Sequence, residues 1–180
     1  PTEAGQLALT LMEKEETVLR AKADDLYNAI YKIIPANEVS PATETLKATG
    51  ELNRQKAASM GVARGVAEGI AGKVKPLTVE EKIMGGKSVS DLPKDWADEI
   101  VAKYKLDNPE RGYTYEGLDL IRKEVRSAWR QAKTASNDNA ARKLKLIEEG
   151  LTGDMTAVAS KYEGGAVALA AADEFYANSI

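Results

Sequence analysis

Apolar residues along most of this chain recur at the three- and four-residue spacing of helices. In residues 13–34 this spacing predicts a helix whose apolar face consists of Leu19, Ala23, Leu26, Ile30 and Ile33, widened by Tyr27 and Ile34. Pro35 ends the helix, because proline disfavours a helical conformation in the residue before it. Residues 1–12 are expected to extend it, since one face is shared by Leu7, Leu11 and Val18.

A second long helix is predicted to begin at Ser40 and Pro41. Serine is a favoured capping residue, and proline is favoured at the first helical position. This helix is expected to reach about residue 74, with a break near Gly61. The segment that follows contains a capping box at residues 78–81, which predicts a short helix, and then the pair Gly85 and Gly86, which ends it.

The second half of the chain begins with two predicted helices. One face of a short helix is shared by Trp96, Ile100 and Tyr104, and that helix is expected to stop before Pro109. Thr114 is the predicted cap of the next helix, residues 115–133. Its buried stripe is expected to consist of Leu118, Ile121, Val125, Ala128 and Ala132.

Two further helices are predicted to complete the chain. Residues 137–139 form a turn and cap. One long helix over 138–162 is then expected to continue through Gly150 and Gly153, because the apolar positions stay in phase across both glycines: Leu144, Ile147, Leu151, Met155, Val158 and Tyr162. Gly164 and Gly165 break it, and an alanine-rich helix follows to about Tyr176.

The pattern therefore predicts an all-α fold, a helical bundle of about six helices with no significant sheet. Residues 13–34, 115–133 and 138–162 are expected to form the main antiparallel packing. Residues 1–180 are interpreted as a single helical domain. Two sub-halves, 1–75 and 92–180 joined by a 76–91 linker, are the alternative, because residues 75–93 contain both diglycine and proline.

Composition limits the chemistry that the chain can perform. It has 180 residues, 43% of them apolar, and neither cysteine nor histidine. Disulfides, thiolate chemistry, Ser-His catalysis and the commonest zinc ligands are thereby excluded. The net charge of −3 argues against a dedicated nucleic-acid-binding protein. No apolar run approaches the roughly 18 residues that a transmembrane helix needs.

Basic side chains are concentrated on the predicted helix 115–133. Arg122, Arg126 and Arg130 follow one another at four-residue intervals and form a ridge that we call the arginine ridge. It is a candidate contact for DNA phosphates or for an acidic partner. The alternative is a solvated face, or ion pairs with acidic residues of the same domain: Asp119, Glu148, Glu149 or Asp173. Docking on a neighbouring helix or subunit is favoured over DNA, because no aromatic residues are interleaved for base stacking.

A glycine repeat marks the second candidate contact. Gly61, Gly65 and Gly69 recur every fourth residue, a spacing that allows another helix to approach closely. Close packing inside the domain is the simpler interpretation, and a helix that rearranges or self-associates is the alternative.

Catalytic, cofactor and metal sites are not expected. The carboxylate pairs, such as Glu80 with Glu81, are adjacent in sequence, so on a helix they point about 100° apart and do not converge on a substrate. Gly86, Lys87 and Ser88 look like the end of a phosphate-binding loop, but Glu81 stands where the first glycine of that motif is required. We therefore expect no enzyme activity and no cofactor.

Two blocks of residues resemble a helical segment of large bacteriophage and prophage virion proteins of the internal, DNA-ejection type. The first block contains Leu26, Tyr27, Ile34, Pro35, Val39, Thr45 and Leu46. The second contains residues 114–118, Ile121, Arg122, Leu144, Leu151, Thr152, Asp154, Met155, Gly165, Ala166 and Tyr176. Arg126 departs from the resemblance, because a glycine is expected there, and this weakens the expectation of a close helix crossing at that point.

The resemblance implies a structural or assembly module of a virion protein associated with genome delivery, with other virion subunits as partners and a homo-oligomer as one form. The expected location is the virion, after synthesis in the bacterial host cytoplasm and with passage into the host envelope on infection. Such proteins are long, so a chain that begins at Pro1 is interpreted as a fragment of a longer polypeptide. A generic helical interaction or scaffold domain is the first alternative. Part of a cell-wall-degrading virion enzyme is the second.

Overall fold

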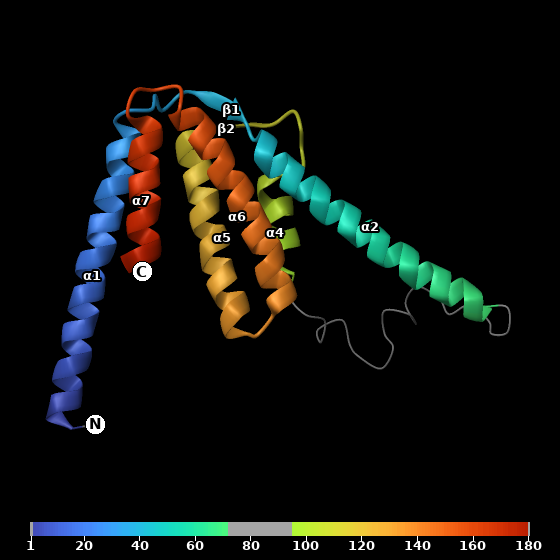
Figure 1. Cartoon of the computed structure of the whole chain (residues 1–180), viewed down its shortest axis with the longest axis horizontal. Helices are drawn as coiled ribbons and strands as arrows, with labels where there is room; N and C mark the ends of the chain where they lie inside the picture. Colours follow the sequence, from blue (N-terminus) through green and yellow to red (C-terminus); the bar gives the residue numbers. More distant parts are fainter. Residues whose placement is uncertain (1, 72–94, 180) are drawn as a thin grey trace.

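The predicted all-α architecture is confirmed. The computed structural model describes the backbone of residues 2–71 and 95–179, and side chains within 2–60 and 95–179. These residues form six helices and one short two-stranded ribbon (Figure 1). The helices are α1 (Glu3–Tyr31), α2 (Thr43–Ala71), α4 (Trp96–Tyr104), α5 (Tyr115–Thr134), α6 (Asp138–Ala159) and α7 (Gly165–Ser179).

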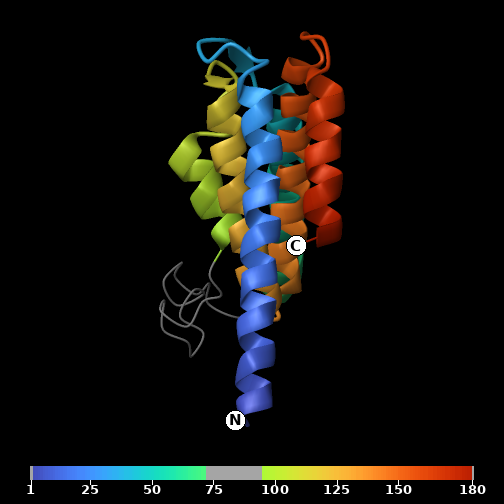
Figure 2. The same cartoon turned by 90° about the vertical axis from the view of Figure 1, so that its left-hand side faces the viewer.

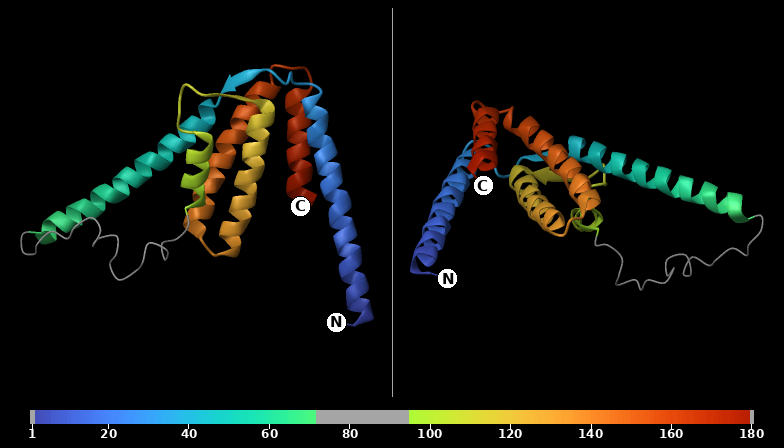
Figure 3. Two further views of the ribbon diagram at one scale, coloured as in Figure 1. Left: turned by 180° about the vertical axis from the view of Figure 1, so that it is seen from behind. Right: turned by 60° about the horizontal axis from the view of Figure 1, so that its bottom comes forward.

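Helices α5 and α6 form an antiparallel pair at the centre of the domain, and α2 and α4 pack on them (Figures 1 and 3). The predicted stripe of α5, from Leu118 to Ala132, is buried at all five positions. The stripe of α6 is confirmed from Leu144 to Val158, where its residues are all buried, but the helix ends at Ala159, so Tyr162 lies beyond it and is half-buried. As predicted, α6 runs through Gly150 and Gly153 without a break, because its buried apolar face outweighs the helix-weakening effect of glycine.

Helix α1 lies mainly along α7, on the outer side of the central pair (Figure 2). Its buried residues are Ala23, Tyr27 and Ile30, and Ile34 is buried just after the helix ends. The prediction that residues 13–34 pack chiefly against α5 and α6 is therefore wrong. Helix α1 packs instead along α7, and α7 in turn contacts α6.

The ribbon corrects the prediction of a helix start at Ser40 and Pro41. Strand β1 (Val39–Pro41) pairs antiparallel with β2 (Gly112–Thr114), with Ser40 opposite Tyr113. Gly112 permits this pairing, because a Cβ atom at that position would overlap the side chain of Val39. Helix α2 accordingly begins two residues later than predicted, and it continues through Gly61 without the expected break.

Local capping signals were predicted correctly in the second half of the chain. The hydroxyl of Thr114 accepts a hydrogen bond from the Gly117 amide at 3.1 Å, and the side chain of Asn137 accepts one from the Ala140 amide. Gly164 has a φ of +76°, which makes the sharp turn between α6 and α7 accessible.

Helices from both ends of the chain share one apolar core. Helix α2 packs on α6 and α1 packs on α7, so residues on either side of the 76–91 segment are in direct contact. The segment itself, with the predicted short helix after residue 78 and the proposed linker, lies outside the described residues.

Replacing Leu151 by alanine should lower the free energy of unfolding by roughly 2–5 kcal/mol, because the side chain is completely buried between helices. Thermal or chemical denaturation measures the loss. Leu120→Ala is the matched control, since that side chain on α5 is 56% exposed and its truncation should cost little. Equal stability of the two variants would contradict the placement of this α6 face in the core.

Candidate functional site

Arg122, the first residue of the arginine ridge, points into the domain. Arg122 has no exposed surface. Its Nη1 donates to Asp173 Oδ2 at 2.9 Å and to Thr152 Oγ1 at 3.2 Å, and its Nη2 lies 3.7 Å from Asp119 Oδ1. The guanidinium also stacks over the ring of Tyr27, 5.5 Å from its centroid. With these neighbours on α1, α6 and α7, Arg122 joins helices and cannot reach a phosphate or a partner.

Arg126 continues the same network one turn further along α5. Its Nε donates to Glu148 Oε1 at 2.8 Å, and its Nη1 donates to the Tyr27 hydroxyl at 3.2 Å. Burial alone would lower the pKa of Arg126, but these hydrogen bonds outweigh that effect and raise it, so the guanidinium stays charged. An ion pair to α6 thus replaces the glycine-mediated helix crossing that the resemblance implied.

Asp173 of α7 joins the parts of this network. It accepts from the Tyr27 hydroxyl at 2.6 Å, from Arg122, and from Arg126 Nη2 at 3.5 Å. Burial and the hydrogen bond to Asp173 raise the pKa of Tyr27 to about 12. Burial and a hydrogen bond to Asp119 likewise raise the pKa of Tyr31. Both phenols are therefore neutral donors near neutral pH, and α1 is held by directed hydrogen bonds as well as by apolar contact.

Only the last ridge residue, Arg130, is exposed. It donates to the Tyr176 hydroxyl. It borders a hollow of about 440 Å³ that is also lined by Trp129, Lys145, Glu148 and Tyr176. The two carboxylates of this hollow, Glu148 and Asp173, already pair with Arg126. The ridge is thus mainly a helix-joining element, and only Arg130 remains open to an outside partner.

A second polar contact joins α2 to α6. The carboxylate of Asp154 is 3% exposed and accepts from the backbone amides of Glu44 and Thr45, both at 2.8 Å, and from the Thr45 hydroxyl at 2.7 Å. These amides belong to the first turn of α2 and have no partner within their own helix. Asp154 therefore caps α2 from another helix, which also places a negative charge at the positive end of the α2 dipole.

Gly150 makes this capping geometry accessible. A Cβ atom at Gly150 would lie 3.0 Å from the Glu44 carbonyl oxygen and 2.8 Å from Thr45 Cα, and the second distance is shorter than real Cβ contacts. The sequence analysis named Asp154 only as part of the resemblance and did not predict its capping contact. The available signal was a carboxylate one turn after Leu151, on the apolar face of α6, which requires buried partners.

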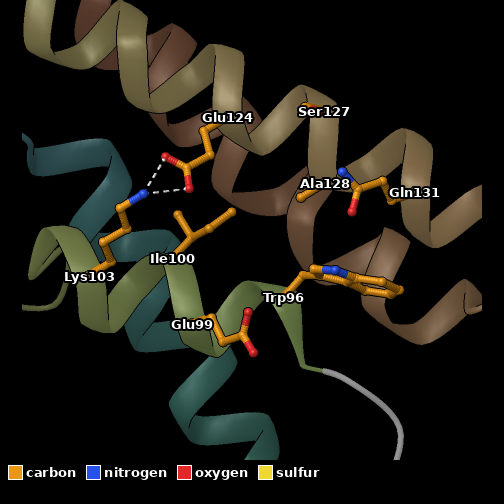
Figure 4. A pocket seen from close by; sticks show the side chains of 8 residues that line it. All are labelled: Trp96, Glu99, Ile100, Lys103, Glu124, Ser127, Ala128 and Gln131. Atoms are coloured by element: carbon orange, nitrogen blue, oxygen red, sulfur yellow. Dashed lines mark hydrogen bonds and ion pairs between the residues drawn. The ribbon is translucent and has the colours of Figure 1, made fainter.

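A third polar cluster lines a cavity of about 340 Å³ between α4 and α5 (Figure 4). Glu124 pairs with Lys103 at 2.9 Å and accepts a hydrogen bond from the Tyr104 hydroxyl. Burial would raise the pKa of Glu124, but these two donors lower it overall. The carboxyl is therefore ionised near neutral pH and has none of the raised pKa that a general acid requires.

The remaining candidate contacts can be placed only in part. Helix α2 passes through Gly61, Gly65 and Gly69, but the contacts of these three glycines lie outside the described side chains. Among the described side chains, which lie within residues 2–60 and 95–179, no group of three or more acidic residues is placed to hold a metal ion. No helix in those ranges is both long enough and apolar enough to cross a membrane.

Several residues of the two sequence blocks lie at contacts between helices. Tyr27, Arg122 and Tyr176 belong to the network around Asp173, while Thr45 and Asp154 form the α2 cap. Gly165 permits close contact with the end of α6. Comparison with known proteins adds no relative: no protein family, curated protein sequence or solved structure matches the chain.

Removal of the Asp173 carboxylate should be costly, because it leaves the buried charge of Arg122 without its closest partner. We expect Asp173→Ala to lower the free energy of unfolding by about 3–5 kcal/mol in chemical denaturation. Arg122→Met combined with Asp173→Leu should restore much of the loss, since it removes both charges. Glu174→Ala, at the exposed neighbouring position, is the control. Equal stability of Asp173→Ala and this control would show that the network does not stabilise the fold.

Asp154→Asn should weaken the first turn of α2, because an amide cannot accept from three donors as a carboxylate does. The expected cost is about 1–3 kcal/mol. Amide hydrogen exchange should accelerate at Glu44 and Thr45 more than at buried α5 residues. Asp138→Asn is the matched control, with a side chain that is 85% exposed. Unchanged exchange at the start of α2 would contradict the capping role.

Proposed function

We propose that this chain is a non-enzymatic structural module of a bacteriophage or prophage virion protein that takes part in genome delivery. One observation supports the proposal: five residues of the resemblance, Tyr27, Thr45, Arg122, Asp154 and Tyr176, form contacts between helices here. Arg122 and Tyr27 tie α5 and α1 to α7, and Asp154 with Thr45 ties α6 to α2. A motif made of helix-joining residues supports a role in building a rigid module, whereas a catalytic motif would converge on a substrate cavity.

Two features of the polar clusters agree with a structural role. The carboxylates of Asp119, Glu148, Asp154 and Asp173 all accept hydrogen bonds or ion pairs from residues of the same domain. Their charges are therefore used internally. Glu124 in the α4–α5 cavity is likewise paired, with a lowered pKa.

A generic helical interaction or scaffold domain is the second candidate. It is favoured by α1, whose residues 3–18 are exposed except for the half-buried Gly5 and include the large apolar side chains Leu7, Leu9, Leu11, Met12 and Val18. Such a surface suits a binding partner of any kind. The two candidates differ in where the protein is found, so particle composition separates them.

Mass spectrometry of purified virions, compared with emptied particles after DNA ejection, tests the proposal. We expect peptides of this chain in full virions and their depletion from emptied particles. Their absence from virions would leave the generic scaffold as the better interpretation.

A muralytic assay tests the remaining alternative, a cell-wall-degrading activity. The 180-residue chain should release no soluble fragments from purified peptidoglycan, with a known lysozyme as positive control. Clear activity that Glu124→Gln abolishes would overturn the proposal, because Glu124 is the carboxylate that pairs with Lys103 in the α4–α5 cavity. Glu174→Gln is the matched exposed control.

A further inference from the structure

The N-terminal half of α1 carries an apolar line that no described residue covers. Leu7, Leu11 and Val18 are 64%, 58% and 66% exposed. They follow one another in steps of four and seven residues, which places them on one side of the helix. Ala4 and Ala21 lie on the same side at the two ends, and Lys14 lies in the middle. We call these six positions the α1 stripe.

The α1 stripe faces away from the rest of the domain. The buried side of α1 is formed by Ala23, Tyr27 and Ile30, which at 100° per residue lies more than 100° around the helix from Val18. The N-terminal half of α1 also extends well past the end of α7 (Figures 1 and 2). Another helix can therefore lie against the stripe without meeting the domain that carries it.

We propose that the α1 stripe is the docking surface for the same stripe of a second copy of this chain, with the two α1 helices antiparallel. The spacing of the stripe supports a second copy, because its steps of three, four, three, four and three residues are the same in both directions and its four outer positions match in size, with Leu11 and Lys14 at the centre. In an antiparallel pair, Ala4 meets Ala21 of the partner subunit, and Leu7 meets Val18 of the partner subunit. At these four outer positions small thus meets small and large meets large, as close packing requires.

Charge selects the antiparallel direction over the parallel one. In a parallel pair Lys14 would face its own copy at the centre of the seam, and two ammonium groups would repel each other there. In the antiparallel pair Lys14 faces Leu11 of the partner subunit. Glu15 lies four residues after Leu11, beside the stripe, so each lysine can extend its ammonium group toward Glu15 of the partner subunit.

The pairing is tested by measuring the mass of the whole chain in solution over a concentration series, by sedimentation equilibrium or light scattering. We expect a monomer–dimer equilibrium. Leu7→Glu with Leu11→Glu should raise the dissociation constant by roughly tenfold or more, because four carboxylates would enter an apolar seam. Leu9→Glu with Met12→Glu is the matched control, since these side chains are similarly exposed but lie off the stripe.

Three outcomes would overturn the proposal: a wild-type chain that is monomeric at high concentration, equal weakening by the control, and no effect of the stripe variant. Circular dichroism establishes that each variant remains helical. If the glutamate variant does not fold, Lys14→Leu replaces it. That change adds an apolar side chain to the seam and should tighten the dimer, and unchanged association would count against the stripe.

Engineered cysteines test the direction, because the chain has no cysteine of its own. A mixture of Leu7→Cys and Val18→Cys chains should form a disulfide-linked dimer on mild oxidation, whereas Leu7→Cys alone should not. A parallel pair would give the opposite result, with efficient cross-linking of Leu7→Cys to itself. That result would refute the antiparallel arrangement.

Discussion

One carboxylate, that of Asp173, connects α1, α5 and α7 through polar contacts. It receives hydrogen bonds from Tyr27 on α1 and from Arg122 and Arg126 on α5. Burying an arginine is unfavourable unless its charge is paired, so any arrangement that separated α7 from α5 would leave the charge of Arg122 without its closest partner. The network therefore fixes the relative position of α1, α5 and α7. Apolar contact between alanine-rich surfaces alone is less directional.

The domain contains two kinds of helix contact, and each suits its location. Between α5 and α6 the contact is mainly apolar, with completely buried side chains such as Leu144 and Leu151, and the ion pair of Arg126 with Glu148 adds to it. The contacts of α7 and of the start of α2 with this pair include a carboxylate that accepts hydrogen bonds across the contact. This carboxylate is Asp173 for α7 and Asp154 for α2. Small residues at these positions, above all Gly150, allow the backbones to approach closely enough for the carboxylates to reach their partners.

The surface of the molecule has two parts that differ in chemistry: one with charged groups paired to each other, and one with exposed apolar side chains. Around the central helices most charged groups are bonded to each other, and Arg130 alone of the arginine ridge is exposed. On the N-terminal half of α1 the balance is reversed, because large apolar side chains lie in solvent. A rigid body with a projecting apolar helix is well suited to assembly through that helix, which agrees with the proposed role in a virion protein.

Hydrophobic periodicity by itself determined the helices of the second half, the stripes of α5 and α6, and the continuity of α6 through its two glycines. Those features depend on residues three and four positions apart, so the information is local. The caps by Thr114 and Asn137 were predictable for the same reason. Only the tertiary structure decided that Ser40 and Pro41 form a strand, that the arginine ridge turns inward, and that Asp154 caps α2. Each of these depends on partners from distant parts of the chain, Tyr113, Asp173 and Thr45, whose proximity arises only when the helices pack.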